Sequence, residues 1–396
     1  MFRKMPFILM VVIAAIMLID LPDIFQQFLY SISVNIKSLI ITILPIIIFC
    51  LLFNSMVNLS NNAGKLIGVV LILVCLSNLF STSLAHFLGS WVYGFDMHII
   101  TPPAEHIGME PLWYFSFPKL IENDKAMFLG IILGLINAKL FSKNAKIYAN
   151  IIDKIIHKVL GVLVYIIPLF VAGFVVKLQS DGVIQIILKD YAGIFLVVGS
   201  SIIIYNLSVY FILSNFNVKK YLTYISNIFP AAISGFCTMS SAASMPLTII
   251  GVERNSDKED IAKSIVPATV NIHLVGDCFA IPIFAYAVLK SYGAMEPSLV
   301  EYMVFALYFV IAKFSVAAIP GGGILVMLPI LEKHLGFTGE MMSLITSIYI
   351  LFDPVITFGN VFGNGAFAKA IDRLYFSNTI LNDKIIDFRK INGDKL

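Results

Sequence analysis

Four polar side chains recur in an otherwise apolar segment near the C-terminus. Asp353, Thr357, Asn360 and Asn364 are four, three and four residues apart, a spacing that places them in one stripe along a helix. If the segment crosses a membrane, the carboxylate costs at least about 2.5–3.5 kcal/mol to insert, so it needs a partner or a ligand. The stripe therefore predicts a binding site for a small polar solute. The alternative is that its hydroxyl and amide groups only bond neighbouring helices.

A second polar group lies in the apolar stretch 264–290. Thr269, His273 and Asp277 recur every four residues, with Asn271 nearby, and on a continuous helix they share one face. A histidine and an aspartate at this spacing can form a charge-assisted pair, and histidine titrates near neutral pH. We predict that His273 and Asp277 form a proton-relay or ion-coupling pair. The alternative is a static buried pair that holds the segment together.

A third candidate is Lys313, which lies in an apolar run just before Pro320-Gly321-Gly322-Gly323. Its side chain either faces the site or reaches back to the membrane interface. The triple glycine is not a phosphate-binding loop, because no GK[ST] sequence follows it.

The composition indicates which solvent these elements face. Of 396 residues, 59% are hydrophobic and 13% charged, against roughly 45–50% and 25% in soluble proteins. A soluble core cannot hide so much apolar surface, so we predict an all-α polytopic membrane protein. The net charge is only +3 and the basic residues are dispersed, which argues against a nucleic-acid partner.

Apolar stretches of the length needed to cross a bilayer fall into two groups. The first six are largely uninterrupted, at 5–30, 37–57, 66–92, 126–142, 155–178 and 191–214. The last four are broken by small, polar, Pro or Gly residues, at 226–252, 264–290, 301–331 and 341–371. The distribution of Lys and Arg in the connecting loops places both termini in the cytoplasm.

That orientation requires two of the ten stretches to enter and leave on the same side. The stretch 226–252 has loops with basic residues on both flanks, and 301–331 has acid-containing loops on both flanks. Each has breakers in its middle, at 240–246 and 317–323. Non-helical backbone at membrane depth persists only where protein or a cavity surrounds it. We predict two re-entrant hairpins that meet near the midplane, a pattern typical of a transporter site.

At these residues the chain resembles the dicarboxylate/amino acid:cation symporter family, which has the glutamate transporter fold. The serine-rich motif of the family's first hairpin is similar to 240–246, and the Pro-Gly-x-Gly tip of its second hairpin to 320–323. Its unwound seventh helix, typically Asn-Met-Asp-Gly-Thr, aligns with 273–277. Its eighth-helix Asp…Asn-Val-x-Gly-Asp pattern resembles Asp353 and 360–364.

The resemblance implies eight transmembrane helices plus two re-entrant hairpins, a homotrimer in the cell membrane, and elevator-like movement. Its domains would be 1–225 (mainly scaffold, with part of the transport domain), 226–375 (transport core) and 376–396 (cytoplasmic tail). Asp353 would receive a substrate amino group, while Asn360 and Ser241 would bond the carboxylate. The substrate-binding set is Ser240, Ser241, Pro320, Gly321, Gly323, Asp353, Thr357 and Asn360.

The sequence departs from the family where ions and side chains bind. Two seventh-helix sodium ligands fall on His273 and Val275, and a sodium aspartate of the eighth helix falls on Asn364. The arginine that pairs with a substrate side-chain carboxylate falls on Ile356. We therefore expect coupling to protons rather than sodium, and a neutral amino acid or monocarboxylate as substrate. The ion-coupling set is His273, Asp277, Asn364 and Lys313, in which Lys313 would act as a fixed cation replacing one ion.

Together these features predict a secondary active symporter for a small amino acid or carboxylate, with H⁺ or Na⁺ as coupling ion and no other cofactor or metal. One alternative is a non-transporting or channel-like relative. Another is an intramembrane hydrolase in which Asp277 and Asp353 share a proton. We therefore do not expect the protein to be an enzyme. We expect its partners to be the solute and the lipid bilayer.

Overall fold

The computed structural model of the chain is helical wherever it has regular structure. It describes residues 21–61, 64–96, 109–118, 121, 123–140, 184–256, 265–316 and 321–393, and separate residues between 147 and 180. No strand occurs among these residues. The first predicted span, apart from its end, and Pro320 therefore lie outside the described residues.

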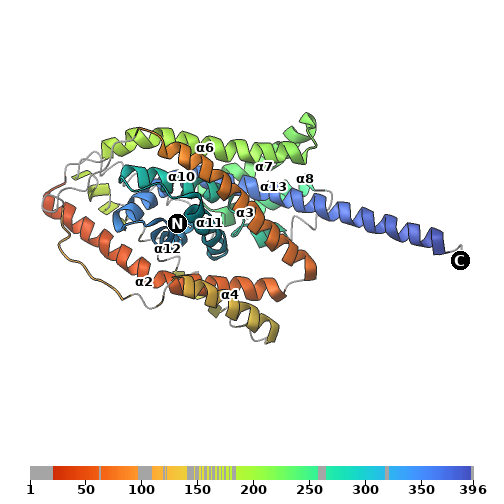
Figure 1. Ribbon diagram of the computed structural model, residues 1–396, viewed down its shortest axis with the longest axis horizontal. Helices are drawn as coiled ribbons and strands as arrows, with labels where there is room; N and C mark the ends of the chain where they lie inside the picture. The colour runs from red at the N-terminus through yellow and green to blue at the C-terminus, as the bar shows by residue number, and fades with distance from the viewer. Residues whose placement is uncertain are drawn as a thin grey trace.

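The helices differ widely in length (Figure 1). They are α2 (Asp23–Asn61), α3 (Gly64–Tyr93), α4 (Asn123–Leu140), α6 (Ile184–Leu213), α7 (Val218–Thr238), α8 (Ser241–Asn255), α10 (Val275–Ser291), α11 (Leu299–Ala312), the 3₁₀ turn η2 (Lys313–Ser315), α12 (Gly322–Leu335) and α13 (Gly339–Gly393). Within the described residues, three segments are long and apolar enough to cross a membrane, namely Val69–Tyr93, Asp190–Leu213 and Gly339–Leu374.

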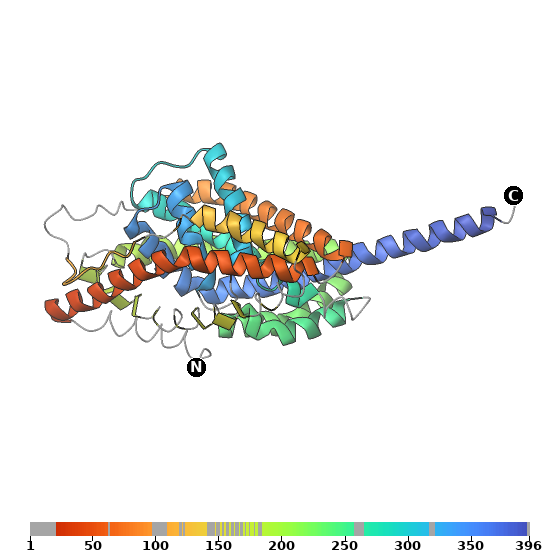
Figure 2. The ribbon, with the colours of Figure 1, turned by 90° about the horizontal axis from the view of Figure 1, so that it is seen from below.

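The buried centre of the molecule is α10, in which every residue except Lys290 is buried. It packs against α3, α6, α12 and α13, and α13 also contacts α7 and α8. Helix α2 pairs with α4 along one side and meets the rest through η2 and α12 (Figures 1 and 2). This arrangement places the polar stripe of α13 directly against α10.

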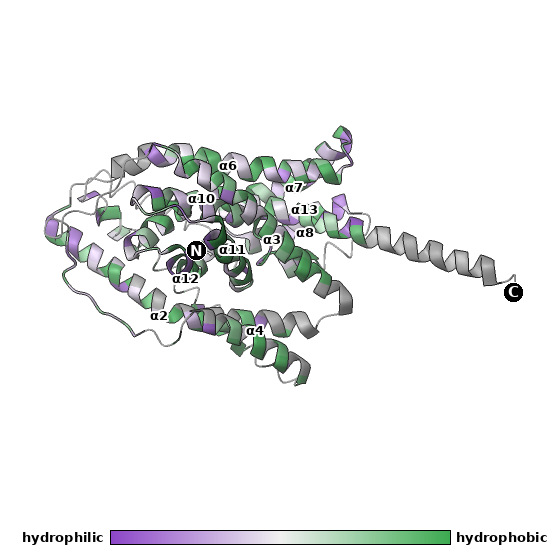
Figure 3. Ribbon diagram, viewed as in Figure 1, coloured by the Kyte–Doolittle hydropathy of each residue, from purple (hydrophilic) through white to green (hydrophobic). Residues whose placement is uncertain are grey.

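The outer surface of these helices is apolar over long stretches (Figure 3). On α3 the side chains of Phe87 and Trp91 are 68% and 60% exposed, and on α6 Leu196 is 75% exposed. Exposed apolar area of this extent is typical of a surface that faces lipid or another protein.

One predicted boundary is wrong. We expected separate spans at 5–30 and 37–57, yet 23–30 and 37–57 belong to the single helix α2, which starts directly after Pro22. The polar residues between the two spans suit a helix because they bond within it: Ser31 donates to Gln27 O and Asn35 to Ser31 O. Ser31 is also buried, so its polarity does not mark a loop.

Helices α7 and α8 form a helical hairpin. The break lies at Met239, which adopts a left-handed conformation (φ 50°), and at Ser240, which caps α8. At the other end, Asn227 donates to Asn255 Oδ1 at 2.8 Å, and Asn255 donates to Tyr224 O at 2.9 Å. The chain therefore returns to where it started, as predicted for 226–252, and the hairpin extends beyond that range at both ends. Pro246, one of the predicted breakers, lies inside α8.

A second hairpin consists of α11, η2 and α12. Its arms pack together, and the rings of Tyr308 and His334 stack across them with centroids 4.2 Å apart. Gly321 caps α12 with φ 70°, a conformation that glycine adopts without the steric cost of a side chain. The prediction of a break at 317–323 fits this turn as far as it is described. The membrane crossings and their count remain predictions.

An unwound segment is present, but it lies earlier than the predicted 273–277, because only 273 and 274 of that range are non-helical. Residues 265–269 are helical, 270–274 are not, and α10 begins at Val275. Asn78 of α3 bonds this non-helical backbone on both sides, donating to Ile272 O at 2.7 Å and accepting from Leu274 N–H at 3.4 Å. These bonds replace those that the helix would have supplied, as buried backbone requires.

Candidate functional site

The site forms where the two hairpins reach α13 from opposite ends. Near the base of the first hairpin, the Lys369 ammonium lies 5.6 Å from the centroid of the Tyr224 ring. Further along α7, Gly235 lies against Val361. From the other direction, the tip of the second hairpin meets α13 at Asp353. Both hairpins thus converge on the stretch of α13 that contains the polar stripe.

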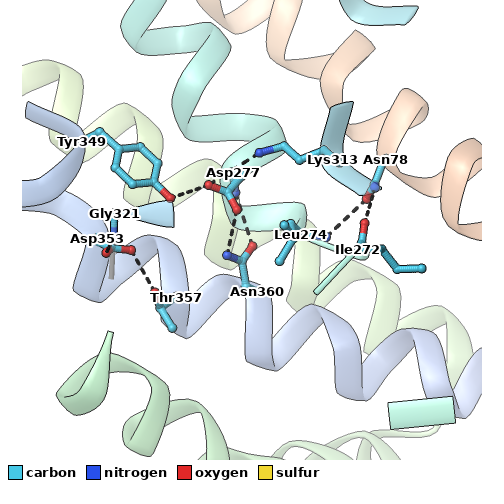
Figure 4. Close-up of polar contacts among 10 residues, drawn as sticks. All are labelled: Asn78, Ile272, Leu274, Asp277, Lys313, Gly321, Tyr349, Asp353, Thr357 and Asn360. Atoms are coloured by element: carbon cyan, nitrogen blue, oxygen red, sulfur yellow. Dashed lines mark hydrogen bonds and ion pairs between the residues drawn. The ribbon is translucent and has the colours of Figure 1, made fainter. Parts of the chain in front are cut away.

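Asp353 lies buried at the tip of the second hairpin (Figure 4). Its Oδ2 accepts a hydrogen bond from the Gly321 N–H at 2.9 Å, and its Oδ1 accepts one from the Thr357 hydroxyl at 3.0 Å. Gly321 is the N-cap residue of α12, and the positive end of a helix dipole favours a carboxylate. The hairpin tip is therefore docked on Asp353 through a backbone donor.

Asp277, in the first turn of α10, is the centre of a denser network. Its carboxylate accepts hydrogen bonds from the Tyr349 hydroxyl at 2.5 Å and the Asn360 amide at 3.0 Å. The Asn360 oxygen accepts in turn from the Asp277 N–H at 3.3 Å. The Lys313 Nζ lies 3.7 Å from Asp277 Oδ1. Three elements thus meet at one carboxylate (Figure 4).

Lys313 is completely buried, with 0% of its side chain exposed. Besides the ion pair, its ammonium lies 4.5 Å from the centroid of the Phe309 ring, within range of a cation–π interaction. Among the described residues the Nζ has no hydrogen-bond partner. The alternative that Lys313 reaches back to an interface is therefore wrong, because burial against Asp277 holds the side chain inside.

Two glycines allow the elements to approach this closely. A Cβ at Gly323 would collide with Tyr349 Oη and Asp277 Oδ1, and a Cβ at Gly276 would collide with the Ile356 carbonyl oxygen. Gly323 therefore belongs to the site through the space it leaves for α12 to reach the Asp277 carboxylate.

The predicted pairing of His273 with Asp277 is wrong. The His273 Nε2 lies 2.9 Å from Ser77 Oγ of α3, and its ring stacks on Phe367 at 4.3 Å. Within the described part of the chain it has no hydrogen bond or ion pair with Asp277. The helix is broken between 270 and 274, so a spacing of four residues no longer makes the two side chains neighbours.

The remaining predicted residues lie around this network. Asn364 accepts a hydrogen bond from Thr269 at 2.7 Å. Ser240 caps α8 by accepting from the Ala243 N–H at 3.2 Å, and Ser241 is buried in the first turn of that helix. The residues that the structure does bring together are Gly321, Gly323, Asp353, Thr357, Asn360, Asp277 and Lys313.

Sequence reasoning missed two residues of the site. Tyr349 donates to Asp277, and it lies four residues before Asp353, so the stripe on α13 could have been extended to it. Asn78 supports the unwound segment from α3, and nothing in its sequence surroundings pointed to that contact.

The charges of the network favour a cationic ligand. Counted as ionised, the carboxylates of Asp277 and Asp353 and the ammonium of Lys313 sum to −2 + 1 = −1. Lys313 lies against Asp277, so the excess negative charge belongs to Asp353. In a buried site such a charge needs a partner, and the ammonium group of an amino acid would supply one.

Comparison with known proteins matches the chain to a symporter family and to amino acid transporters. Residues 5–374 match the sodium:dicarboxylate symporter family. A putative sodium-dependent excitatory amino acid transporter, glt-4 of Caenorhabditis elegans, is 25% identical over 154 residues, which are 39% of this chain and 30% of that protein. The human and mouse excitatory amino acid transporter 2 are 24% identical over 224 residues, 55% of this chain and 38% of theirs. The matches thus span less than two-fifths of these relatives' length.

Proposed function

Because the chain belongs to the sodium:dicarboxylate symporter family, we propose that it moves a small amino acid across a cell membrane together with a cation. The observation that carries this proposal is the buried carboxylate of Asp353 beneath the tip of the second hairpin. A substrate ammonium would bind there, with Thr357 beside it. The substrate carboxylate would bind the N–H groups that start α12, with Asn360 and Ser241 as further donors.

The neighbours of the site support an amino acid over a dicarboxylate. The fully buried Ile356 takes the place of an arginine, and the ammonium of Lys313 is already paired with Asp277. A second substrate carboxylate would then enter a low-dielectric site without a cation, at a cost of several kcal/mol. A monocarboxylate would leave the Asp353 carboxylate without a counter-charge. A neutral amino acid supplies an ammonium group to Asp353 and brings no second carboxylate.

The coupling ion we favour is the proton, although the glt-4 relative is described as sodium-dependent. Two carboxylates of the family's sodium sites are Val275 and Asn364 here. Asp277 is engaged by Lys313 and Tyr349, which leaves Asp353 and His273 as candidate proton carriers. The Nδ1 atom of His273 is buried without a partner among the described residues.

The same proposal includes the arrangement in the membrane. Eight crossings with two re-entrant hairpins, a homotrimer and elevator-like movement of 226–375 are what the family resemblance implies. The cytoplasmic location of both termini rests on the distribution of Lys and Arg in the loops. Family membership points to a transporter and not to an enzyme. The hydrolase alternative also lacks its geometry, because Asp277 and Asp353 bond different partners and no hydrogen bond joins them in the described structure.

Uptake into proteoliposomes tests the proposal. We expect labelled alanine or serine to accumulate when an inward proton gradient is imposed, and His273→Gln to reduce that accumulation more than it reduces exchange at equal pH. Sodium-driven uptake insensitive to pH would refute proton coupling. Inhibition by aspartate or glutamate but not by alanine or serine would refute the neutral substrate. No flux with any solute would favour the non-transporting relative.

A further inference from the structure

The surroundings of the Lys313 ammonium favour a positive charge. Lys313 is the C-cap residue of α11, the helix end where the dipole favours positive charge. Its Nζ faces the Asp277 carboxylate at 3.7 Å and the Phe309 ring at 4.5 Å. Both of these groups attract a cation, and both are buried.

Asp277, whose Oδ1 lies 3.7 Å from the ammonium, is surrounded by oxygens of the kind that bind a hard cation. Asp277 contributes two carboxylate oxygens, and Tyr349 Oη lies 2.5 Å from one of them. The amide oxygen of Asn360 lies 3.3 Å from the Asp277 N atom. A cluster of anionic and neutral oxygens in a buried setting can hold a desolvated metal cation as well as an ammonium. The ammonium holds no hydrogen bond to any of them, so its attraction is that of a charge.

We infer that the Lys313 ammonium is a built-in cation at Asp277, occupying the place where a free sodium ion would otherwise bind. Two cations on one carboxylate in a low-dielectric interior repel each other strongly, so the tethered ammonium excludes the ion. Sodium does not fit the site as it stands, and removing the lysine charge would create a sodium site.

What this cation means for ion coupling rests on the proposed transport function. Because Lys313 belongs to the chain, its charge returns with the protein in each transport cycle. The Asp277 position then carries no ion across the membrane, and coupling must come from another group. The binding statement itself can be tested without transport.

The test is thermal unfolding of the purified full chain without substrate, in sodium chloride and in choline chloride of equal concentration. The readout is the rise in melting temperature in sodium chloride relative to choline chloride, counting only the part that Asp277→Asn abolishes. A ligand that binds only the folded state stabilises that state in proportion to ln(1 + [Na⁺]/Kd). We expect no such rise for the wild type and a rise of several degrees for Lys313→Ala. The double variant Lys313→Ala/Asp277→Asn should show none.

Lys313→Gln is the second variant in case Lys313→Ala does not fold, because the amide keeps most of the side-chain volume without its charge. A wild-type rise abolished by Asp277→Asn would overturn the inference. So would folded Lys313→Ala and Lys313→Gln proteins that respond equally to sodium and choline. Either result leaves the proposed uptake of amino acids untouched, because no substrate is present in the measurement.

Discussion

Asp277 and Asp353 lie in the same buried region yet have different kinds of partner. Asp277 faces an ammonium and two side-chain donors, whereas Asp353 receives hydrogen bonds from a backbone N–H and a hydroxyl. The Lys313 ammonium therefore compensates the charge of Asp277, whereas both donors at Asp353 are neutral. A buried carboxylate without a counter-charge is the one that gains most from an incoming ammonium, so we assign substrate binding to Asp353 and a structural role to Asp277.

Replacing Asp353 by Asn should abolish accumulation while the protein still folds. The amide oxygen can still accept from the Gly321 N–H, and the burial cost of the carboxylate is removed, so stability should hold or rise. The substrate ammonium loses its counter-charge. Uptake together with size-exclusion chromatography checks this, and uptake equal to the wild type would remove Asp353 from the substrate site.

Lys313 and Asp277 should be strongly coupled in stability. Removing one partner of a buried pair leaves an unpaired charge and typically costs about 3–5 kcal/mol, so Lys313→Met or Asp277→Asn alone should be severely destabilising. The double variant should cost clearly less than the sum of the two. Lys219→Met, at an exposed position, is the control and should change stability by no more than about 0.5 kcal/mol. Thermal unfolding in choline chloride measures all four, and additive effects would contradict the pairing.

Sequence reasoning found most of these residues but not their pairing. The stripe Asp353, Thr357, Asn360 and Asn364 was predictable because one helix carries it, and all four side chains are buried. The partner of Asp277 was not, because Lys313 belongs to another element and only the packing of the second hairpin brings it close. Assigning His273 to Asp277 failed since the spacing argument assumed a continuous helix.

At the scale of the elements, breaks in helices were easier to predict than their exact position. The turn at Gly321 lies within the predicted break at 317–323, whereas the unwound segment, predicted at 273–277, lies at 270–274. In the first hairpin the chain turns at Met239, a non-glycine residue with positive φ, which no composition rule indicates. Helix α2 shows the converse, because a polar stretch within it forms buried hydrogen bonds and continues the helix.

Adding a methyl group at Gly323 should prevent the second hairpin from closing. Its Cβ would collide with Tyr349 Oη and Asp277 Oδ1, both of which are held by their own hydrogen bond. Overpacking of this kind typically costs about 1–3 kcal/mol, and here it also separates α12 from α10. We expect Gly323→Ala to lose transport and to melt at a lower temperature.

Gly193→Ala is the matched control for Gly323→Ala. Gly193 lies in α6, and a Cβ there would meet nothing within 4 Å. Alanine in a helix interior is favoured over glycine by roughly 0.5–1 kcal/mol, so this variant should be as stable as the wild type or more so. If Gly323→Ala transports as well as Gly193→Ala, the hairpin does not need to pack as tightly as it does here.

At the scale of the whole molecule, the contacts form two groups. Helices α2 and α4 pair with each other, and Ser33 of α2 donates to Phe170 O at 2.6 Å. Helices α3, α6, α7, α8, α11, α12 and α13 form the other group together with α10. The two groups meet where α2 contacts η2 and α12, close to Lys313 and the hairpin tip, and where Phe128 of α4 contacts Tyr308 of α11. An elevator movement of the second group would have to slide at this junction, directly beside the site.

The orientation of the hairpins follows from α13. Its candidate span Gly339–Leu374 has 36 residues, about 54 Å at 1.5 Å per residue. In a bilayer whose hydrocarbon core is about 30 Å thick, the ends of such a span would lie on opposite faces. The second hairpin ends at Gly336, just before α13 begins. Tyr224, near the base of the first hairpin, lies beside Lys369 at the other end. The two hairpins should therefore enter from opposite faces.

Cysteine accessibility in intact cells tests this orientation. Exposed positions flank each hairpin, Lys219 and Arg254 on the first, Met295 and Glu340 on the second. In a background without the four native cysteines, cysteine at Lys219 or Arg254 should react with an impermeant reagent only after permeabilisation, because the positive-inside rule predicts that both lie on the cytoplasmic side. Cysteine at Met295 or Glu340 should react from outside. Labelling of one hairpin's two flanks from opposite sides would make it a pair of full crossings, and the site could not then form from two re-entrant tips.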